Sequence, residues 1–157
     1  MRFSVKTQAF YASEIDYGDS LPSDAAEIND EQYRQFYEAV NNDSRIYFSD
    51  GAFVISSQRP DDYHSWDENS NEWIMTDEDI ERKKRHILQV ATDEKQRRIS
   101  QANDYINSKQ WPGKAAIGRL KGDELAQYNL WLDYLDALEA VDTSSAPDIN
   151  WPTPPEV

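Results

Sequence analysis

Residues 76–113 read TDEDIERKKRHILQVATDEKQRRISQANDYINSKQWPG, and this stretch decides the fold. Three acidic residues follow Thr76, and acidic side chains favour the positive N-terminal end of a helix. Apolar residues then recur at the spacing of one helix face: Ile80, Ile87, Val90 with Ala91, Ile99, Ala102 and Ile106. The pattern predicts one helix from Thr76 or Asp77 to about Gln110. Trp111-Pro112-Gly113 interrupts it there, because proline lacks the backbone donor that a helix interior needs.

The middle of this predicted helix is weak. Residues 92–98 contain no aliphatic side chain, so a break near Thr92-Asp93 is an alternative. After the interruption, Ala115–Leu120 is expected to form a further helical turn, and a last helix is expected from Asp123 to about Val141. The apolar residues of the last helix cover an arc of roughly 220°, against about 100° for a helix packed on one side. The N-terminal part, a second copy or a foreign partner is expected to cover the surplus.

The first half of the chain reads as a small mixed unit. Phe3 and Val5 alternate and Phe10-Tyr11 follows a short polar break, which predicts paired strands. Asn29 or Asp30 is expected to cap a helix that ends at Asn41-Asn42-Asp43. Asp50-Gly51 predicts a tight hairpin turn, because glycine tolerates a positive φ. A second hairpin or loop is expected between Trp66 and Trp73.

These patterns together predict an α+β protein with two parts. Residues 1–76 form a mixed domain of β-hairpins with one helix, and residues 77–157 form a domain built on a long-helix hairpin. The tail, residues 142–157, is expected to run extended because four prolines lie between Ala146 and Pro155. Trp151 and Ile149 within the tail indicate that it docks on a surface.

The charge is strongly negative and unevenly distributed. The formal net charge is −14: residues 1–79 carry 18 Asp or Glu against 5 Lys or Arg, whereas residues 80–109 carry 4 against 8. Phosphate backbones and anionic membranes repel such a chain, so we expect neither nucleic acid nor a membrane as a partner. The chain has no cysteine and no long apolar run, so we expect a soluble protein without disulfides or a signal peptide.

We find no pattern that predicts catalysis, a cofactor or a metal. His64 and His86 lie in different segments without a partner at metal-ligand spacing. Gly113-Lys114 lacks the upstream glycine and the following Ser or Thr of a phosphate-binding loop. The acidic run between Trp66 and Trp73 lacks the central glycine of a calcium loop. We therefore expect no enzyme and no cofactor.

Aromatic residues are the remaining signal. The chain has nine Tyr and five Trp, and such side chains serve equally as interface anchors and as core. We propose that six of these aromatic residues contact a partner, together with two aliphatic residues and a proline. Those in the C-terminal part are Trp131, Tyr134, Leu138, Val141, Trp151 and Pro152, and those in the N-terminal part are Tyr11, Trp66 and Trp73. The competing interpretation is that they pack internally.

The residues LWLDYLDALEAVDTSSAPDINWPTPP, at 130–155, resemble the C-terminal signature of the phage tail fibre assembly family, which has members in lambda- and Mu-like phages. The signature is a Trp and a Tyr three apart on a helix, then Val-Asp, Ala-Pro and Trp-Pro. With the long helix before it, the resemblance covers about residues 76–155. Phe10-Tyr11, Leu21-Pro22 and the Trp66–Trp73 segment resemble the family more loosely.

The resemblance implies a chaperone that folds and assembles trimeric tail fibres in the host bacterial cytoplasm, without ATP or a catalytic residue. It implies that the N-terminal domain recognises the distal, C-terminal region of the cognate fibre and that the helical domain supplies the general chaperone function. Self-association is a further expectation. The alternative is a permanent subunit of the fibre tip that touches host polysaccharide. A nucleic-acid mimic and a glycan-cleaving enzyme are weaker alternatives.

Overall fold

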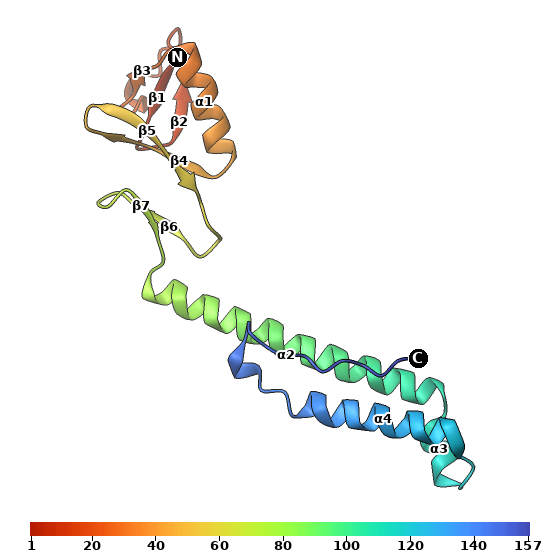
Figure 1. Cartoon of the computed structure of the whole chain (residues 1–157). Coiled ribbons are helices and arrows are strands. Elements are labelled where there is room, and N and C mark those ends of the chain that lie inside the picture. Colours follow the sequence, from red (N-terminus) through yellow and green to blue (C-terminus); the bar gives the residue numbers. More distant parts are fainter. The chain divides into compact units, whose positions relative to one another are not determined.

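The computed structural model describes all residues from Met1 to Val157. It contains helices and small antiparallel sheets, which confirms the α+β class (Figure 1). The chain forms two compact units, Met1–Ile80 and Glu81–Val157, and each is described by itself.

The N-terminal unit begins with a three-stranded antiparallel sheet. Strands β1 (Arg2–Ser4) and β2 (Ala9–Tyr11) form the predicted pair, with Phe3 opposite Phe10. Strand β3 (Ala26–Glu27) lies on the other side of β1 and was not predicted, because two exposed residues carry no alternating pattern. A short 3-10 helix, Gly18–Ser20, lies in the loop before it.

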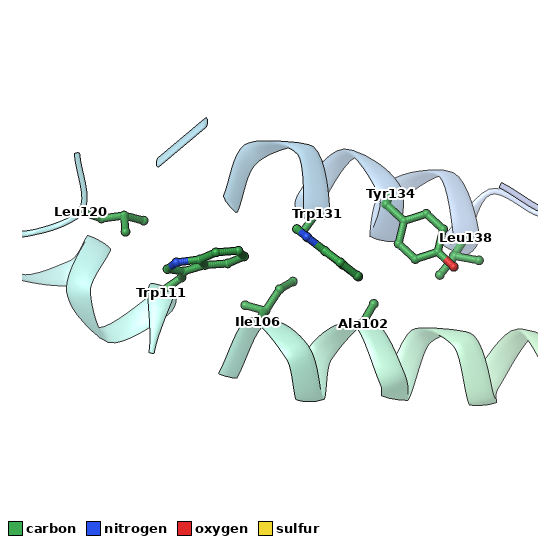
Figure 2. Close-up of a cluster of buried hydrophobic side chains, with 7 residues drawn as sticks. All are labelled: Ala102, Ile106, Trp111, Leu120, Trp131, Tyr134 and Leu138. Carbon is green, nitrogen blue, oxygen red and sulfur yellow. The ribbon is translucent and has the colours of Figure 1, made fainter. Parts of the chain in front are cut away.

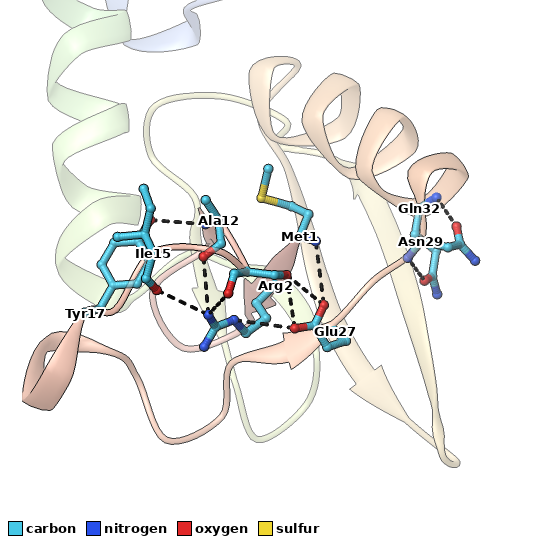
Figure 3. Close-up of polar contacts among 9 residues, drawn as sticks. Met1, Arg2, Ala12, Ile15, Tyr17, Glu27, Asn29 and Gln32 are labelled. Carbon is cyan, nitrogen blue, oxygen red and sulfur yellow. Dashed lines mark hydrogen bonds and ion pairs between the residues drawn. The ribbon is translucent and has the colours of Figure 1, made fainter.

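Hydrogen bonds from one arginine hold this loop. The Arg2 guanidinium donates to the carbonyl oxygens of Ala12, Ser13 and Ile15 at 3.3, 2.9 and 3.4 Å. Its Nε also lies 3.5 Å from the Glu27 carboxylate (Figure 3). These polar contacts help to hold β3 and the loop against the sheet.

Helix α1 (Asp30–Asn41) begins where the sequence predicts. The Asn29 side chain accepts a hydrogen bond from the Gln32 backbone N–H at 2.8 Å, and the Gln32 side chain accepts one from the Asn29 N–H at 3.0 Å (Figure 3). This reciprocal capping box satisfies two donors at the helix start. The helix ends before Asp43, whose positive φ of 56° turns the chain into the next strand.

Two hairpins complete the unit: the first was predicted, and the second was expected as a hairpin or a loop. Strands β4 (Ser44–Ser49) and β5 (Ala52–Gln58) flank Asp50 and Gly51, which have φ of 51° and 80°, as a two-residue turn of type I′ requires. Strands β6 (Ser65–Asp67) and β7 (Glu72–Ile74) place Trp66 opposite Trp73. The core of the unit is rich in phenylalanine and consists of Phe3, Ile28, Phe36, Ala39 and Ile46, with Phe10 and Phe53 packed against it.

The helical unit is dominated by α2 (Asp77–Ser108), whose first turn belongs to the N-terminal unit. The helix is continuous, so the alternative of a break near Thr92-Asp93 is wrong. Polar contacts support the weak middle: the Glu94 carboxylate accepts hydrogen bonds from Arg97 and Arg98, at 2.6 to 2.7 Å.

The connection after α2 differs from the prediction. Helix α2 ends at Ser108. Trp111-Pro112-Gly113 was expected only to interrupt the helix, but it forms the start of the short helix α3 (Trp111–Ala116). Proline is well tolerated there, because the first turn of a helix does not use its backbone donors. Gln110, with φ of 59°, makes the reversal. The helical turn predicted at Ala115–Leu120 therefore lies too late in the chain.

Helix α4 (Gly122–Glu139) matches the predicted last helix to within two residues at its C-terminal end. A 3-10 turn, Thr143–Ser145, follows it. Ala146–Asp148 form a turn with a cis Ala146-Pro147 peptide bond, where an extended chain was expected. From Ile149 onward the tail has no regular secondary structure, as predicted, and it runs back along α2 and α4 (Figure 1).

Candidate protein-binding surfaces

The core of the helical unit lies between the three helices. Its buried side chains come from α2, α3, the connection and α4 (Figure 2): Ala102, Ile106, Trp111, Leu120, Trp131, Tyr134 and Leu138. The Trp131 ring stacks on Tyr105 with centroids 4.4 Å apart and meets Tyr134 edge to face at 5.8 Å. The signature aromatics of α4 therefore hold the helices together.

Three of the predicted partner-binding residues are core residues in the structure. Trp131 is 7% exposed, Tyr134 8% and Leu138 0%, so little of each side chain is open to a partner. They were expected at the surface because the apolar arc of α4 seemed too wide for its neighbours. The sequence could not show that α2, α3 and the tail approach α4 from several directions. Whether these residues ever meet a partner stays a prediction.

Two buried indole groups have no acceptor. The Nε1–H groups of Trp111 and Trp131 are buried without a hydrogen-bond partner. Leaving such a donor unpaired costs roughly 1–3 kcal/mol, which the packing of the rings must offset.

The tail docks on the helix pair through Trp151. This side chain is half-buried and packs on the core, and the Arg98 guanidinium lies 4.8 Å from its ring centroid. Arg98 in turn donates to Glu94 at 2.6 Å, so the cation is held in place. Val141 and Pro152 are also half-buried. The expectation that the tail docks on a surface is confirmed, and that surface belongs to its own unit.

Two hollows border the docked tail. One, of about 340 Å³, is mostly apolar and lies between Ile87, Val90 and Ala91 of α2 and Pro147 and Ile149 of the tail. The other, of about 590 Å³, lies against α4 and is lined by Leu130, Tyr134, Ala137, Pro152 and Pro155, among others.

The apolar surface that stays open on α4 comes from other members of the same arc. Leu125, Leu130 and Leu132 are exposed, although none of them was among the predicted site residues. The sequence placed all three in the arc, but the arc alone does not say which side meets a neighbour. These leucines are the apolar residues of α4 that a partner could reach without unfolding the unit.

The open end of the helix pair is held by polar contacts. The Lys95 ammonium donates to the carbonyl oxygens of Glu139 and Val141 at 2.8 and 3.0 Å, which satisfies acceptors at the end of α4. Hydrogen bonds from Arg97 and then Arg98 lower the pKa of Glu94 from 4.5 to about 2. Glu94 is therefore ionised whenever the unit is folded near neutral pH.

The predicted aromatics of the N-terminal unit form a small cluster. Trp66 and Trp73 are half-buried and meet edge to face with centroids 5.2 Å apart, and Tyr47 lies 5.4 Å from Trp66. These rings line a hollow of about 390 Å³ together with Ile55, Asn71 and Glu72, among others. Tyr11 lies elsewhere, edge to face with Tyr17 at 5.2 Å. The structure thus brings Trp66 and Trp73 together and leaves Tyr11 apart.

The remaining polar groups do not gather into a larger centre. His64 Nδ1 lies 2.6 Å from Asp61 Oδ1, and its side chain is mostly buried. Its carbonyl oxygen accepts a hydrogen bond from Arg59 Nε at 2.8 Å, which ties the pair into the loop before β6. No three metal-ligating side chains come together. None of the helices combines the length and apolarity that crossing a membrane would require.

Comparison with known proteins agrees with this picture. Residues 6–156 match the family model described as Caudovirales tail fibre assembly protein, lambda gpK. The uncharacterized Escherichia coli K12 protein YfdK is 47% identical over 159 residues, which cover 99% of this chain and 95% of that protein. The K12 protein YmfS is 75% identical over 67 residues, 43% of this chain and 49% of that protein. An Escherichia coli tail fiber assembly protein homolog is 36% identical over 91 residues, 57% of this chain and 41% of that protein.

No solved structure matches the chain. The family match covers nearly all of the sequence, so the chain belongs to the tail fibre assembly protein family of tailed bacteriophages. Membership confirms the resemblance carried by residues 130–155. It also gives the chain a role in the assembly of tail fibres.

Proposed function

We propose that this protein is a chaperone for trimeric tail fibres, and that it binds the distal, C-terminal region of its cognate fibre without catalysis. The observation that carries the proposal is the family match over residues 6–156. In this proposal the protein acts in the host bacterial cytoplasm during phage assembly. It requires no cofactor.

The surface chemistry supports this role. An unassembled fibre chain exposes apolar faces and open strand edges, which promote aggregation. Leu125, Leu130 and Leu132 offer apolar surface on α4, and the two hollows beside the tail offer more. The net charge of −14 keeps a complex with an apolar client dispersed.

We assign different tasks to the two predicted domains. Residues 1–76 recognise the particular fibre, and residues 77–157 provide the general chaperone surface. In the second domain, the buried Trp131, Tyr134 and Leu138 hold the helices in place, and the exposed leucines of α4 contact the client. Val141, Trp151 and Pro152 contribute where the tail borders this surface.

Co-expression tests the proposal. The C-terminal region of the fibre encoded beside this gene is produced with and without the protein, and soluble fibre trimer is measured. We expect trimer only when the protein is present. Equal amounts of soluble trimer without it would contradict the chaperone function.

A double substitution probes the assigned surface. Leu125→Ser with Leu132→Ser removes exposed apolar area from α4 and leaves its buried face unchanged. We expect the variant to fold normally and to yield less soluble trimer. The matched control is Gln101→Ser, an exposed polar position of α2. A normal yield from the double variant would remove Leu125 and Leu132 from the client-binding surface.

A second candidate function is a permanent subunit of the fibre tip that contacts host polysaccharide. The observation that favours it is the hollow lined by Tyr47, Trp66 and Trp73, because half-buried aromatic rings beside polar side chains suit sugar rings. Purified virions distinguish the two. Stoichiometric amounts of the protein on virions support a tip subunit, whereas its absence leaves the chaperone function alone.

A further inference from the structure

The β4–β5 hairpin has two outer edges, because each strand has a strand neighbour on one side only. Ser49 and Ala52 flank the two-residue turn, so they exchange backbone hydrogen bonds, and Tyr47 and Val54 form the next such pair. Residues between these pairs turn their N–H and C=O groups away from the partner strand. The hairpin therefore presents one row of backbone groups on each outer side.

The chain itself covers the outer edge of β4 at Ile46. The Gln8 side-chain amide donates to the carbonyl oxygen of Ile46 at 2.7 Å and accepts from the Ile46 N–H at 2.9 Å. The same amide donates to the Val5 carbonyl at 2.7 Å. Gln8 thus imitates a neighbouring strand, and it does so from a left-handed conformation with φ of 53°.

The outer edge of β5 is not covered in this way. Phe53 and Ile55 lie opposite Phe48 and Ile46, so their N–H and C=O groups point outward. No hydrogen bond of the structure satisfies these groups. The row ends at Ser57, whose carbonyl oxygen accepts from Trp73 Nε1 at 2.9 Å. The open section therefore has a defined length and one closed end.

We propose that the open edge of β5 pairs with an extended strand of the fibre client, which becomes a third strand of this sheet. The inference rests on the proposed function and adds the site and mode of binding. Only an extended backbone matches two donors and two acceptors in this alternation. The aromatic hollow lies beside the edge, since Ile55 and Ser57 line it together with Trp66 and Trp73. It can take a side chain of the added strand.

The chemistry of the edge selects the occupant. Residues 1–79 carry a net charge of −13, so pairing this edge with the same edge of a second copy would bring two strongly acidic units together. An acid-poor strand of another chain has no such penalty. Phe48 is 56% exposed and Ile55 40%, so apolar side chains of that strand find apolar neighbours at the edge.

Ile55→Pro in the full-length protein tests the pairing. The substitution removes an outward N–H and leaves the hydrogen bonds to β4 intact, and proline is tolerated on edge strands. Ile55→Val is the control, because it keeps the N–H and most of the side chain. With the co-expressed fibre C-terminal region as the probe, we expect at least a tenfold loss of complex for Ile55→Pro and little change for Ile55→Val.

Amide hydrogen exchange of the unsubstituted protein gives an independent test. We expect the Phe53 and Ile55 amides to exchange at least tenfold more slowly in the complex, whereas the Ile46 amide is protected already. A complex that forms with both amides unprotected overturns the strand pairing and leaves the chaperone function standing. Absence of any complex overturns the proposed function. The same protection in the protein alone, rising with concentration, would assign the edge to self-association.

Discussion

Replacing Trp131 with alanine separates a packing role from a binding role. Truncating a large aromatic core residue to alanine lowers the unfolding free energy by about 3–5 kcal/mol. The ring is 93% buried, stacks on Tyr105 at 4.4 Å and contacts Tyr134 at 5.8 Å, which places it fully in this class. Removing the unpaired Nε1–H reduces this loss, because a buried donor without a partner carries a desolvation cost. We therefore expect a loss of about 3 kcal/mol.

Trp131→Phe is the matched variant. It keeps an aromatic ring between the helices and removes the unpaired indole N–H. The smaller ring leaves a cavity, but the relief of the buried donor offsets part of that loss. We expect the substitution to cost about 1 kcal/mol or less.

Urea unfolding of the full-length protein measures both variants, with circular dichroism at 222 nm to follow the helices. With a slope of roughly 1 kcal/mol per M, a loss of about 3 kcal/mol lowers the midpoint of the helical unit by about 3 M. A midpoint within about 0.5 M of the unsubstituted protein would refute the packing argument. If that variant also failed to solubilise the fibre, Trp131 would be a binding residue after all.

Three further perturbations address other parts of the molecule. Asn29→Ala removes half of the capping box on α1 and should cost about 1 kcal/mol in the unfolding free energy of the N-terminal unit, measured by urea titration. Glu94→Gln should destabilise the helical unit at pH 6 and progressively less toward pH 2, because the pKa of Glu94 is about 2 in the folded chain against 4.5 ordinarily. A group with a lowered pKa stabilises fully above its unfolded pKa, and the contribution is lost as pH falls through the folded value. Trp151→Ala removes the ring that Arg98 contacts at 4.8 Å and should speed proteolysis of the tail, followed by mass spectrometry.

Each of these has a matched control. Asn29→Asp keeps an acceptor for the helix start and should be nearly neutral. Glu81→Gln removes an exposed carboxylate elsewhere on α2, so a pH dependence equal to that of Glu94→Gln would show that general charge is responsible. Pro154→Ala changes an exposed tail residue, and proteolysis as fast as in Trp151→Ala would mean that Trp151 does not anchor the tail.

Local chemistry explains what could be predicted of the fold. The Asp50-Gly51 turn and the Asn29 cap depend on a few adjacent residues, so the sequence shows both directly. The long helix from Asp77 was predicted for the same reason, since its caps and its apolar stripe lie within one stretch. Its continuity was not clear, because the hydrogen bonds that Glu94 accepts from Arg97 and Arg98 lie outside the apolar pattern.

Long-range packing explains what could not be predicted. Trp131 and Leu132 are adjacent in the same apolar arc, yet one is core and the other exposed. The difference depends on where α2 and the tail approach, and the helical wheel contains no information on that. Gln8 is a similar case. A polar residue in a turn gives no sign that its side chain will cover a strand edge thirty-eight residues further along the chain.

The two ends of the α2–α4 helix pair are held by different interactions. Near α3 the helices are joined by buried rings, and salts that strengthen apolar burial tighten this end. At the opposite end the half-buried Lys95 donates hydrogen bonds to carbonyl groups at the end of α4, and dissolved ions screen the attraction of its charge to the helix dipole. Rising ionic strength therefore weakens the contacts at the Lys95 end of the helix pair, whereas the end near α3 stays packed. The tail begins directly after this end of α4, so we expect added salt to loosen the first residues of the tail before it affects the core near α3.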